Sequence, residues 1–408
     1  MDPAPPRPPP TPLALRIARE IGEGRIPFAQ FMERALYDPE GGYYMKRLPP
    51  EVRKRDYYTS PDVGETFGRC LACQLAEMWR VLDGPPRFRI VELGAGRGLL
   101  CRDICRALER DAPDCLSRTD YVAVERSPGR RRGLEEGLDS EGDAWRGRVA
   151  WVDSVQEVPS GITGVVFSNE FFDALPVHRV RPLRDGVSEV YVRAAGGGGF
   201  HEELGEPSTP ALAAHFEALG LAPSGEDEKA RTEINLKAMD LMRTIGRKLL
   251  RGFVLTLDYG HPASELYAPH RVSNGGTLMC YHRHRAHADP YIHVGEQDLT
   301  AHVDFTALAM AGREEGLAPA GFTDQHHALV GLGVAEEVWS VPPGEGEEAI
   351  RALHRNLSIK NLLLPGGLGG ALKVLIQHKG VAPGKAQTLS SLQSALYKTS
   401  DLLPAPQG

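Results

Sequence analysis

Short runs of apolar residues recur through the middle of the chain, and each one ends at a polar or glycine-rich segment. The first run covers residues 88–93, and similar runs follow at 121–125, 148–154 and 164–168. A strand that is covered on both faces loses the alternation of polar and apolar positions, so these runs are typical of a buried parallel sheet. Helix-compatible stretches lie between them, most clearly at residues 99–110. Strands that alternate with helices predict an α/β fold with a doubly wound sheet.

The pattern predicts further elements on either side of these runs. Apolar segments at 252–260 and 371–378 predict two more strands, and residues 177–192 predict a β-hairpin around Arg184-Asp185-Gly186. Periodicity predicts helices at 67–82, 211–219 and 231–250. After residue 193 the composition shifts to Gly, Pro, Ser and Glu, which marks an insertion. We expect a disordered proline-rich tail (1–12), an N-terminal helical or cover region (13–82), a core in two pieces (83–193 and 251–380), an inserted helical substrate region (194–250) and a loose C-terminal tail (381–408).

Three glycines follow the first predicted strand. The segment contains Glu92, Gly94, Gly96 and Gly98 and leads into a predicted helix. A strand, a glycine turn and a helix together bind nucleotide-like ligands above the edge of an open sheet, although an ordinary tight turn gives the same pattern. An acid at the end of the strand suits a cationic or amine-bearing ligand better than a pyrophosphate. Glu92 therefore favours S-adenosylmethionine over NAD as the cofactor.

Acidic residues also end the next two predicted strands. Glu125 can accept both hydroxyls of a ribose, and it lies further from the glycines than the NAD fingerprint requires. Asp153 falls where the amino group of an adenine would be bound. Both residues are therefore candidates for cofactor binding.

The fourth predicted strand runs into Asn169, Glu170 and, after two phenylalanines, Asp173. Open sheets place their chemistry at such strand ends, so Glu170 and Asp173 are candidate catalytic groups, acting as bases or as anchors for a cation. Asn169 is a candidate cofactor ligand. In the alternative interpretation, Asn169 is the N-cap of a helix and the two acids lie near the positive end of its dipole.

Residues 56–69 are rich in hydroxyls, glycine and aromatic side chains. They predict either a loop that covers the ligand, with Thr59 and Ser60 among its contacts, or a plain loop in which Asp62 caps the following helix. The sequence does not favour one of these over the other.

Composition narrows the class of partner. The net charge of −7 gives no general attraction to nucleic acid or to an anionic membrane, and no apolar run is long enough to span a bilayer. With neither a secretory signal nor a transit peptide visible, we expect a cytoplasmic protein.

Two groups of residues raise the question of a metal. Cys70 and Cys73 form a C-x-x-C pair, but they lie in a predicted helix and no second pair exists, so we interpret them as small apolar residues with reduced thiols. Residues 261–302 are rich in histidine without a recognised ligand spacing, and we expect a polar, substrate-facing loop and no metal site.

Together, these segments resemble the MidA-like family of class I methyltransferases. The resemblance rests on residues 56–69, 91–100, 168–179, 257–259, 276–278, 281–286 and 300–305, which include the runs Asn-Glu-Phe-Phe-Asp-Ala-Leu-Pro and Thr-Ala-His-Val-Asp-Phe. It implies a seven-stranded S-adenosylmethionine fold with an added helical region, and methyl transfer to a protein. The glycine motif of the family falls on Glu92, Gly94, Gly96 and Gly98, and its ribose acid on Glu125.

The family also suggests a substrate. Its mitochondrial member methylates an arginine of a complex I subunit, so the resemblance implies a protein substrate such as a respiratory-complex subunit, and the mitochondrial matrix as location if the host is eukaryotic. A guanidinium acceptor needs carboxylates that match its donors, with Glu170 first and Asp173 second. Two alternatives stay open: a small-molecule O- or N-methyltransferase, and a cofactor-binding assembly factor or chaperone with little turnover. The oligomeric state, including a homodimer, is also open.

Overall fold

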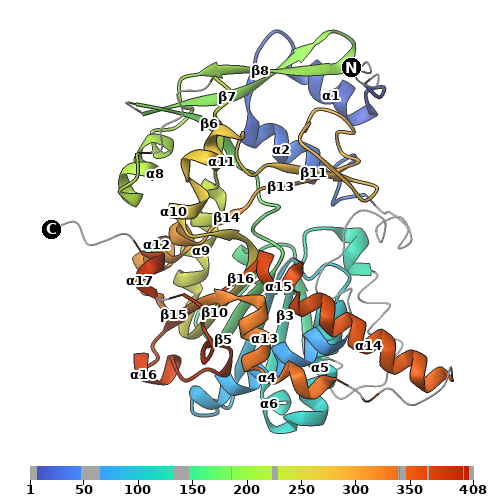
Figure 1. The fold of residues 1–408 in the computed structure, drawn as a ribbon, viewed down its shortest axis with the longest axis vertical. Helices are drawn as coiled ribbons and strands as arrows, with labels where there is room; N and C mark the ends of the chain where they lie inside the picture. Colours follow the sequence, from blue (N-terminus) through green and yellow to red (C-terminus); the bar gives the residue numbers. More distant parts are fainter. Residues whose placement is uncertain are drawn as a thin grey trace. The chain divides into compact units, whose positions relative to one another are not determined.

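The computed structural model describes residues 7–46, 65–132, 147–184, 186–222, 228–338, 340, 346–364, 367–397 and 399–403 (Figure 1). The chain forms two compact units. Unit 1 contains residues 1–57, 173–238 and 263–304, and unit 2 contains residues 58–172, 239–262 and 305–408. The segment boundaries expected from composition fall elsewhere and stay a prediction.

Unit 2 is built on a mixed sheet, in which seven strands from the described residues follow the order β15-β16-β10-β5-β2-β3-β4. The strands from β10 to β4 are parallel, and β15 and β16 pair antiparallel at the other edge. The predicted α/β class and the predicted strands are confirmed. The strands are β2 (Phe88–Leu93), β3 (Thr119–Val124), β4 (Val149–Val152), β5 (Ile162–Asn169), β10 (Leu249–His261), β15 (Ala318–Asp324) and β16 (Leu372–Lys379).

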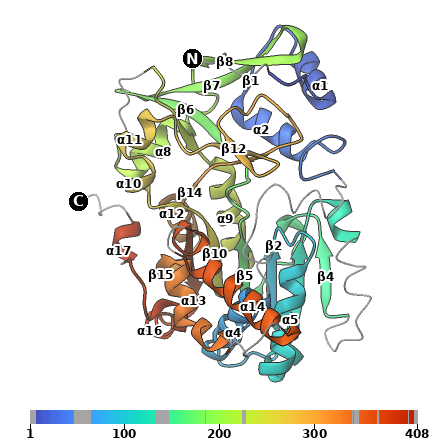
Figure 2. The same cartoon turned by 45° about the vertical axis from the view of Figure 1, so that its right-hand side comes forward.

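Consecutive apolar side chains make this sheet buried on both faces. Val165, Val166 and Phe167 of β5 are all buried, so neither face of that strand contacts water. On one face Phe88 and Phe167 pack with residues of several helices in one core cluster. In Figure 2 β10, β5 and β2 follow one another across the sheet. The helices are α4 (Glu65–Val81), α5 (Leu99–Asp111), α6 (Pro113–Ser117), α12 (Phe305–Glu314), α13 (Gln325–Gly331), α14 (Glu347–Leu363), α15 (Leu368–Ala371), α16 (Pro383–Ala386) and α17 (Thr399–Leu402).

Unit 1 contains two smaller sheets with helices against them. A five-stranded sheet has the order β1-β7-β6-β9 with β8 on β7, and a three-stranded one has the order β12-β11-β13. The predicted hairpin is confirmed as β6 and β7. The elements are α1 (Pro12–Ile21), β1 (Ile26–Pro27), α2 (Phe28–Tyr37), β6 (His178–Leu183), β7 (Gly186–Ala195), β8 (Gly199–Gly205), α8 (Ala211–Leu219), β9 (Thr232–Ile234), α10 (Ala263–Leu266), α11 (Pro269–Ser273), β11 (Met279–His282), β12 (Arg285–His287) and β13 (Asp298–Thr300).

Three local expectations are wrong. The predicted helix at 231–250 is instead the strand β9 followed by α9 (Leu236–Lys248), because Thr232–Ile234 pairs with β6. The histidine-rich segment 261–302 is not a loop: His282 and His287 lie on paired strands of a hairpin. The segment after residue 380 is not loose, since Ala386 and Leu389 are completely buried. In each case tertiary packing overrides a weak local signal.

Candidate functional site in unit 2

The predicted glycine turn lies between β2 and α5. Gly94, Gly96 and Gly98 have φ values of 69°, 58° and 71°, which is the left-handed region that glycine adopts without strain. The N–H groups of Gly94 and Ala95 both donate to the carbonyl of Val124, at 2.9 and 3.1 Å. The turn is therefore tied to the neighbouring strand β3 and holds a defined shape.

Two of the glycines are needed for different reasons. A Cβ atom on Gly94 would lie 2.7 Å from the ring of Phe171, so this glycine lets Phe171 pack on the turn. Among the described residues, a Cβ atom on Gly96 would come within 4 Å of the carbonyl of Gly94 alone, at 3.8 Å. Within that part of the chain the space beside Gly96 is therefore open, as the approach of a ligand to the backbone requires.

Glu125 lies directly after β3 and is buried. Its Oε2 accepts a hydrogen bond from Gly96 N–H and its Oε1 accepts one from Ser127 N–H, each at 2.8 Å. A carboxylate has about four lone-pair positions, so it can still accept bonds from a ligand. The structure thus assigns Glu125 a further role, because it holds the glycine turn.

Glu92 is buried beneath the same turn, and its Oε2 accepts a hydrogen bond from the hydroxyl of Tyr121 at 2.6 Å. Burial raises the pKa of the Glu92 carboxyl to about 8, with a bond from Tyr121 that opposes this and the charge of Glu125 that adds to it. A cationic group near Glu92 would favour the ionised carboxylate. The environment of Glu92 is therefore compatible with an amine-bearing ligand.

Asn169 is the last residue of β5, and no helix begins there: residues 170–175 form bends around a turn at 173–174, so the N-cap interpretation is wrong. Asn169 Nδ2 donates to Glu170 Oε1 at 3.1 Å. Among the described residues, its buried Oδ1 atom has no hydrogen-bond partner. Because buried polar atoms are normally paired, this oxygen is an acceptor suited to a ligand.

Glu170 is held in an unusual backbone conformation, with φ of 49°. A non-glycine residue in the left-handed region is strained and has to be stabilised by its surroundings. Its N–H donates to the carbonyl of Leu257 at 2.9 Å. The strained residue Glu170 follows the end of β5, and the next residue, Phe171, contacts the glycine turn.

The sequence analysis missed Asp258, which supports this segment. Asp258 is completely buried on β10, and its Oδ2 accepts hydrogen bonds from the N–H groups of Phe171 and Phe172 at 3.0 and 2.7 Å. Its Oδ1 accepts one from Tyr259 N–H at 2.9 Å. The signal was present, because Asp258 follows an apolar run as Glu92 does.

The remaining predicted site residues have surroundings of their own. Asp153 follows β4, with a side chain that is 54% exposed and pairs with Arg131 at 2.5 Å. Asp173 is buried and belongs to unit 1, where its carbonyl accepts from Ala301 N–H at 3.0 Å. Thr59 and Ser60 lie outside the described residues. The structure thus brings together Glu92, the three glycines, Glu125, Asn169 and Glu170.

Two other features of the described part of the chain bear on function. Among those residues, no three His, Cys, Asp or Glu side chains form a group that could hold a metal ion. No helix within the same ranges is long and apolar enough to cross a membrane.

The arrangement fits S-adenosylmethionine. The space beside Gly96 leaves room for the cofactor. The carboxylates of Glu92 and Glu125 can accept hydrogen bonds from its amino group and its ribose hydroxyls, and the unpartnered Oδ1 of Asn169 can accept one from a further N–H donor. These groups lie at the ends of β2, β3 and β5, where the strand order reverses. Open α/β sheets bind their ligands at that place.

Comparison with protein families gives a match over residues 70–323 to the family Methyltransf_28, described as S-adenosyl-L-methionine-dependent methyltransferases. The chain is 30% identical over 322 residues to the Drosophila melanogaster "Protein arginine methyltransferase NDUFAF7 homolog, mitochondrial", covering 73% of this chain and 69% of the relative. It is 26% identical over 346 residues to the Homo sapiens "Protein arginine methyltransferase NDUFAF7, mitochondrial", covering 80% and 74%.

The fold is also similar to a solved structure. A COG1565 superfamily member from Burkholderia thailandensis, crystallised with S-adenosyl-homocysteine, is 30% identical, and the TM-score is 0.82. The match covers 97% of this chain and 100% of that one. A protein of the same fold therefore holds the demethylated form of the predicted cofactor.

Proposed function

Because this chain belongs to the MidA-like family of S-adenosylmethionine-dependent methyltransferases, we propose that it transfers the methyl group to an arginine side chain of a protein. The observation that carries the proposal is the similarity to relatives named protein arginine methyltransferase over about three quarters of this chain. Glu170, at the end of β5 beside the glycine turn, supplies a carboxylate that can bind the guanidinium of an arginine.

When bound, S-adenosylmethionine would supply a methyl group on a sulfonium: the acceptor nitrogen would bond to the methyl carbon in line as the carbon–sulfur bond breaks, the neutral thioether would leave, and the methylated nitrogen would lose a proton to solvent. The protein therefore has to position the acceptor and stabilise charge. In our proposal Gly96 leaves room for the cofactor, Glu92 faces its amino group, Glu125 accepts from its ribose, and Asn169 contributes its free oxygen. Asp153 would accept from the adenine.

Glu170 is the residue that we propose holds the acceptor. A guanidinium presents its donors as a planar fork, which a carboxylate matches with two hydrogen bonds. The strained backbone of Glu170 is fixed by Leu257 and, through Phe171, by Asp258. A carboxylate that is fixed in this way orients the guanidine nitrogen and stabilises its positive charge. We propose Asp173 as the second candidate carboxylate for the acceptor.

The test is methyl transfer from tritiated S-adenosylmethionine into the lysate proteins of host cells that lack the gene, followed by amino-acid analysis. We expect radioactive methylarginine. Glu170→Gln should lower its formation by about 100-fold, as the loss of one charge-stabilising group does in other enzymes. Calorimetry should show unchanged affinity of this variant for S-adenosylhomocysteine. A respiratory-complex subunit is the first labelled protein to look for, because the named relatives are mitochondrial.

Gly96→Val is the matched control, since a valine would fill the open space beside the turn and remove cofactor binding and transfer together. A label found in another amino acid or in small molecules would overturn the choice of arginine. Full activity of Glu170→Gln would overturn the role of that residue.

A further inference from the structure

Helix α14 (Figure 1) packs against other helices of unit 2 with one side and leaves apolar side chains exposed on the other. Ile359 and Leu362 are buried on the packed side, where the helix contacts α13 and α15. Four large apolar side chains are 42–49% exposed, and these are Ile350, Leu353, Leu357 and, directly after the helix, Leu364. The described part of the chain thus leaves a patch of apolar surface uncovered on this helix.

The four exposed residues form one row along the helix. They follow one another at intervals of three, four and seven positions. These are the intervals between the a and d positions of a coiled coil, in which each apolar side chain packs into a hole between side chains of a second helix. Single exposed apolar residues are common on protein surfaces, whereas a row with this spacing is suited to contact with another helix.

Charged residues of opposite sign lie at the two ends of the row. Glu347 and Glu348 are in the first turn of α14, and Lys360 is in its last turn. Lys360 takes the d position between Leu357 and Leu364, so it lies in the row itself. Among the described residues, neither Glu347 nor Lys360 forms an ion pair within the chain. The row is therefore apolar in its middle, acidic at one end and basic at the other.

We propose that this row binds the same row on a second copy of the chain, with the two α14 helices antiparallel. With a two-fold axis beside residue 355, Leu353 of each copy faces Leu357 of the other. Lys360 of each copy then faces Ile350 of the other, one helical turn from Glu347. The aliphatic part of the lysine covers the isoleucine, and its ammonium group reaches the unpaired carboxylate.

The charges favour an antiparallel second copy over the other arrangements. In a parallel pair each residue meets its own counterpart, so two Lys360 ammonium groups would repel one another within the apolar row. The antiparallel pair brings each acidic end to a basic end, and it also places the helix dipoles in opposite directions. The row is short compared with a standard interface, so we expect a weak dimer, with a dissociation constant of about 10–100 µM.

The experiment is analytical ultracentrifugation of the full chain at concentrations from about 1 µM to about 200 µM, which span the expected constant. We expect the average mass to rise with concentration toward twice the mass of the chain. Leu353→Asp should weaken association by at least about tenfold, because it places a charge opposite Leu357 in the apolar row. Leu353 is exposed in the single chain, so this variant should fold and keep the circular dichroism spectrum of the wild type.

Reversal of the end charges tests the antiparallel arrangement. Glu347→Lys alone and Lys360→Glu alone should each weaken association by about threefold or more, because each places like charges together twice in the dimer. A mixture of the two single variants should associate as the wild type does, since both contacts in the mixed dimer then join opposite charges. Such mutual rescue requires that position 347 of one copy lie near position 360 of the other.

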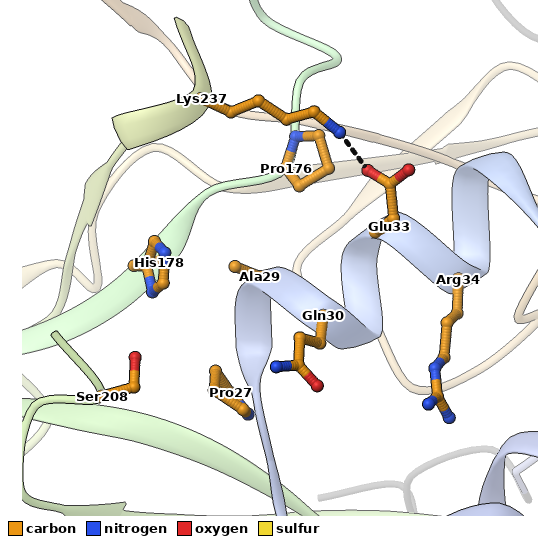
Figure 3. Close-up of a pocket in the computed structure, with 9 residues that line it drawn as sticks. All are labelled: Pro27, Ala29, Gln30, Glu33, Arg34, Pro176, His178, Ser208 and Lys237. Carbon is orange, nitrogen blue, oxygen red and sulfur yellow. Dashed lines mark hydrogen bonds and ion pairs between the residues drawn. The ribbon is translucent and has the colours of Figure 1, made fainter. Parts of the chain in front are cut away.

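Two matched controls change similar residues elsewhere. Lys237→Glu alters the net charge as Lys360→Glu does, but Figure 3 shows Lys237 beside a pocket of about 430 Å³ in unit 1, where it pairs with Glu33 at 2.6 Å. Because this ion pair is complete within one chain, the variant should leave association unchanged. Leu250→Asp, at an exposed leucine of β10, should also leave it unchanged.

A chain that stays monomeric up to about 200 µM would overturn the proposal. A dimer that Leu353→Asp does not weaken would place the interface elsewhere and would overturn it too. Mixed single variants that associate no better than either one alone would rule out the antiparallel arrangement. The readout is association, so each of these results leaves the proposed methyl transfer untouched.

Discussion

At the scale of single residues, polar groups at the ends of parallel strands have different environments and therefore different chemistry. Glu92 is closed off from water and bonded to one hydroxyl, whereas Glu125 accepts two backbone N–H groups. Asp153, one strand further, is half exposed and paired with an arginine. Residue type and position after a strand predict a site, but the surroundings determine the charge that each group carries.

Glu92 leads to a prediction about stability and pH. Because burial raises the pKa of Glu92 to about 8 from an ordinary value of 4.5, the folded protein keeps a proton that the unfolded chain has lost between these values. Stability is therefore highest below pH 4.5 as far as this group is concerned, and it falls as pH rises toward 8, by up to about 1.4 kcal/mol per pH unit. In Glu92→Gln this decline should disappear, as measured by thermal unfolding of the cofactor-free protein between pH 5 and 8.

Glu109→Gln provides the comparison, because Glu109 is an exposed acid on α5. Its profile should follow that of the wild type. If Glu92→Gln also follows the wild type, Glu92 is ionised in the folded protein and the assignment of its protonation is wrong.

At the scale of elements, the segment after β5 depends on the neighbouring strand β10. Asp258 accepts the N–H groups of Phe171 and Phe172, and Leu257 accepts that of Glu170. The backbone conformation of Glu170, the candidate catalytic residue, is thus held by a strand that begins about 80 positions later in the sequence. Phe171 in turn contacts the position of Gly94, which connects this segment to the glycine turn.

Asp258→Asn tests this dependence. An asparagine replaces one acceptor oxygen with an NH₂ group that faces a backbone N–H, and a buried donor left without a partner costs about 1–3 kcal/mol. We expect a loss of that size in the free energy of unfolding, measured in urea. Asp120→Asn, which removes the charge that pairs with Arg87 at 2.6 Å and with Arg89 at 3.6 Å, should change stability by less than about 0.5 kcal/mol. Equal stability of the two variants would contradict the supporting role.

At the scale of the whole molecule, burial determines which thiols can react. All six cysteines are free, and Cys73 is exposed whereas the other five are buried. Burial also raises the pKa of the Cys70 thiol to about 12. The C-x-x-C pair therefore consists of one buried and one exposed residue on α4.

We expect one thiol of the native protein to react readily with Ellman's reagent, and six after unfolding in guanidinium chloride. The thiolate is the reactive form and needs access to the reagent. Cys73 is the one exposed cysteine, and because burial raises its pKa too, its reaction should become faster as the pH rises. Cys73→Ala should remove the fast reaction. A second fast thiol in the native protein would show that the packing around one of the five buried cysteines opens readily.

The amino-acid sequence by itself determined six of the seven strands described in the order β15 to β4, the glycine turn and the acids at the ends of β2 and β3, but not β15. Apolar runs and glycine clusters are local signals, because burial on both faces and left-handed backbone each demand particular residue types at particular places. Only the tertiary structure decided that Thr232–Ile234 is a strand, that Asn169 leads into a turn, and that Asp258 holds Phe171 and Phe172. These outcomes depend on contacts with residues that lie far away along the chain. A local pattern of residues does not indicate which distant segment will pack against it.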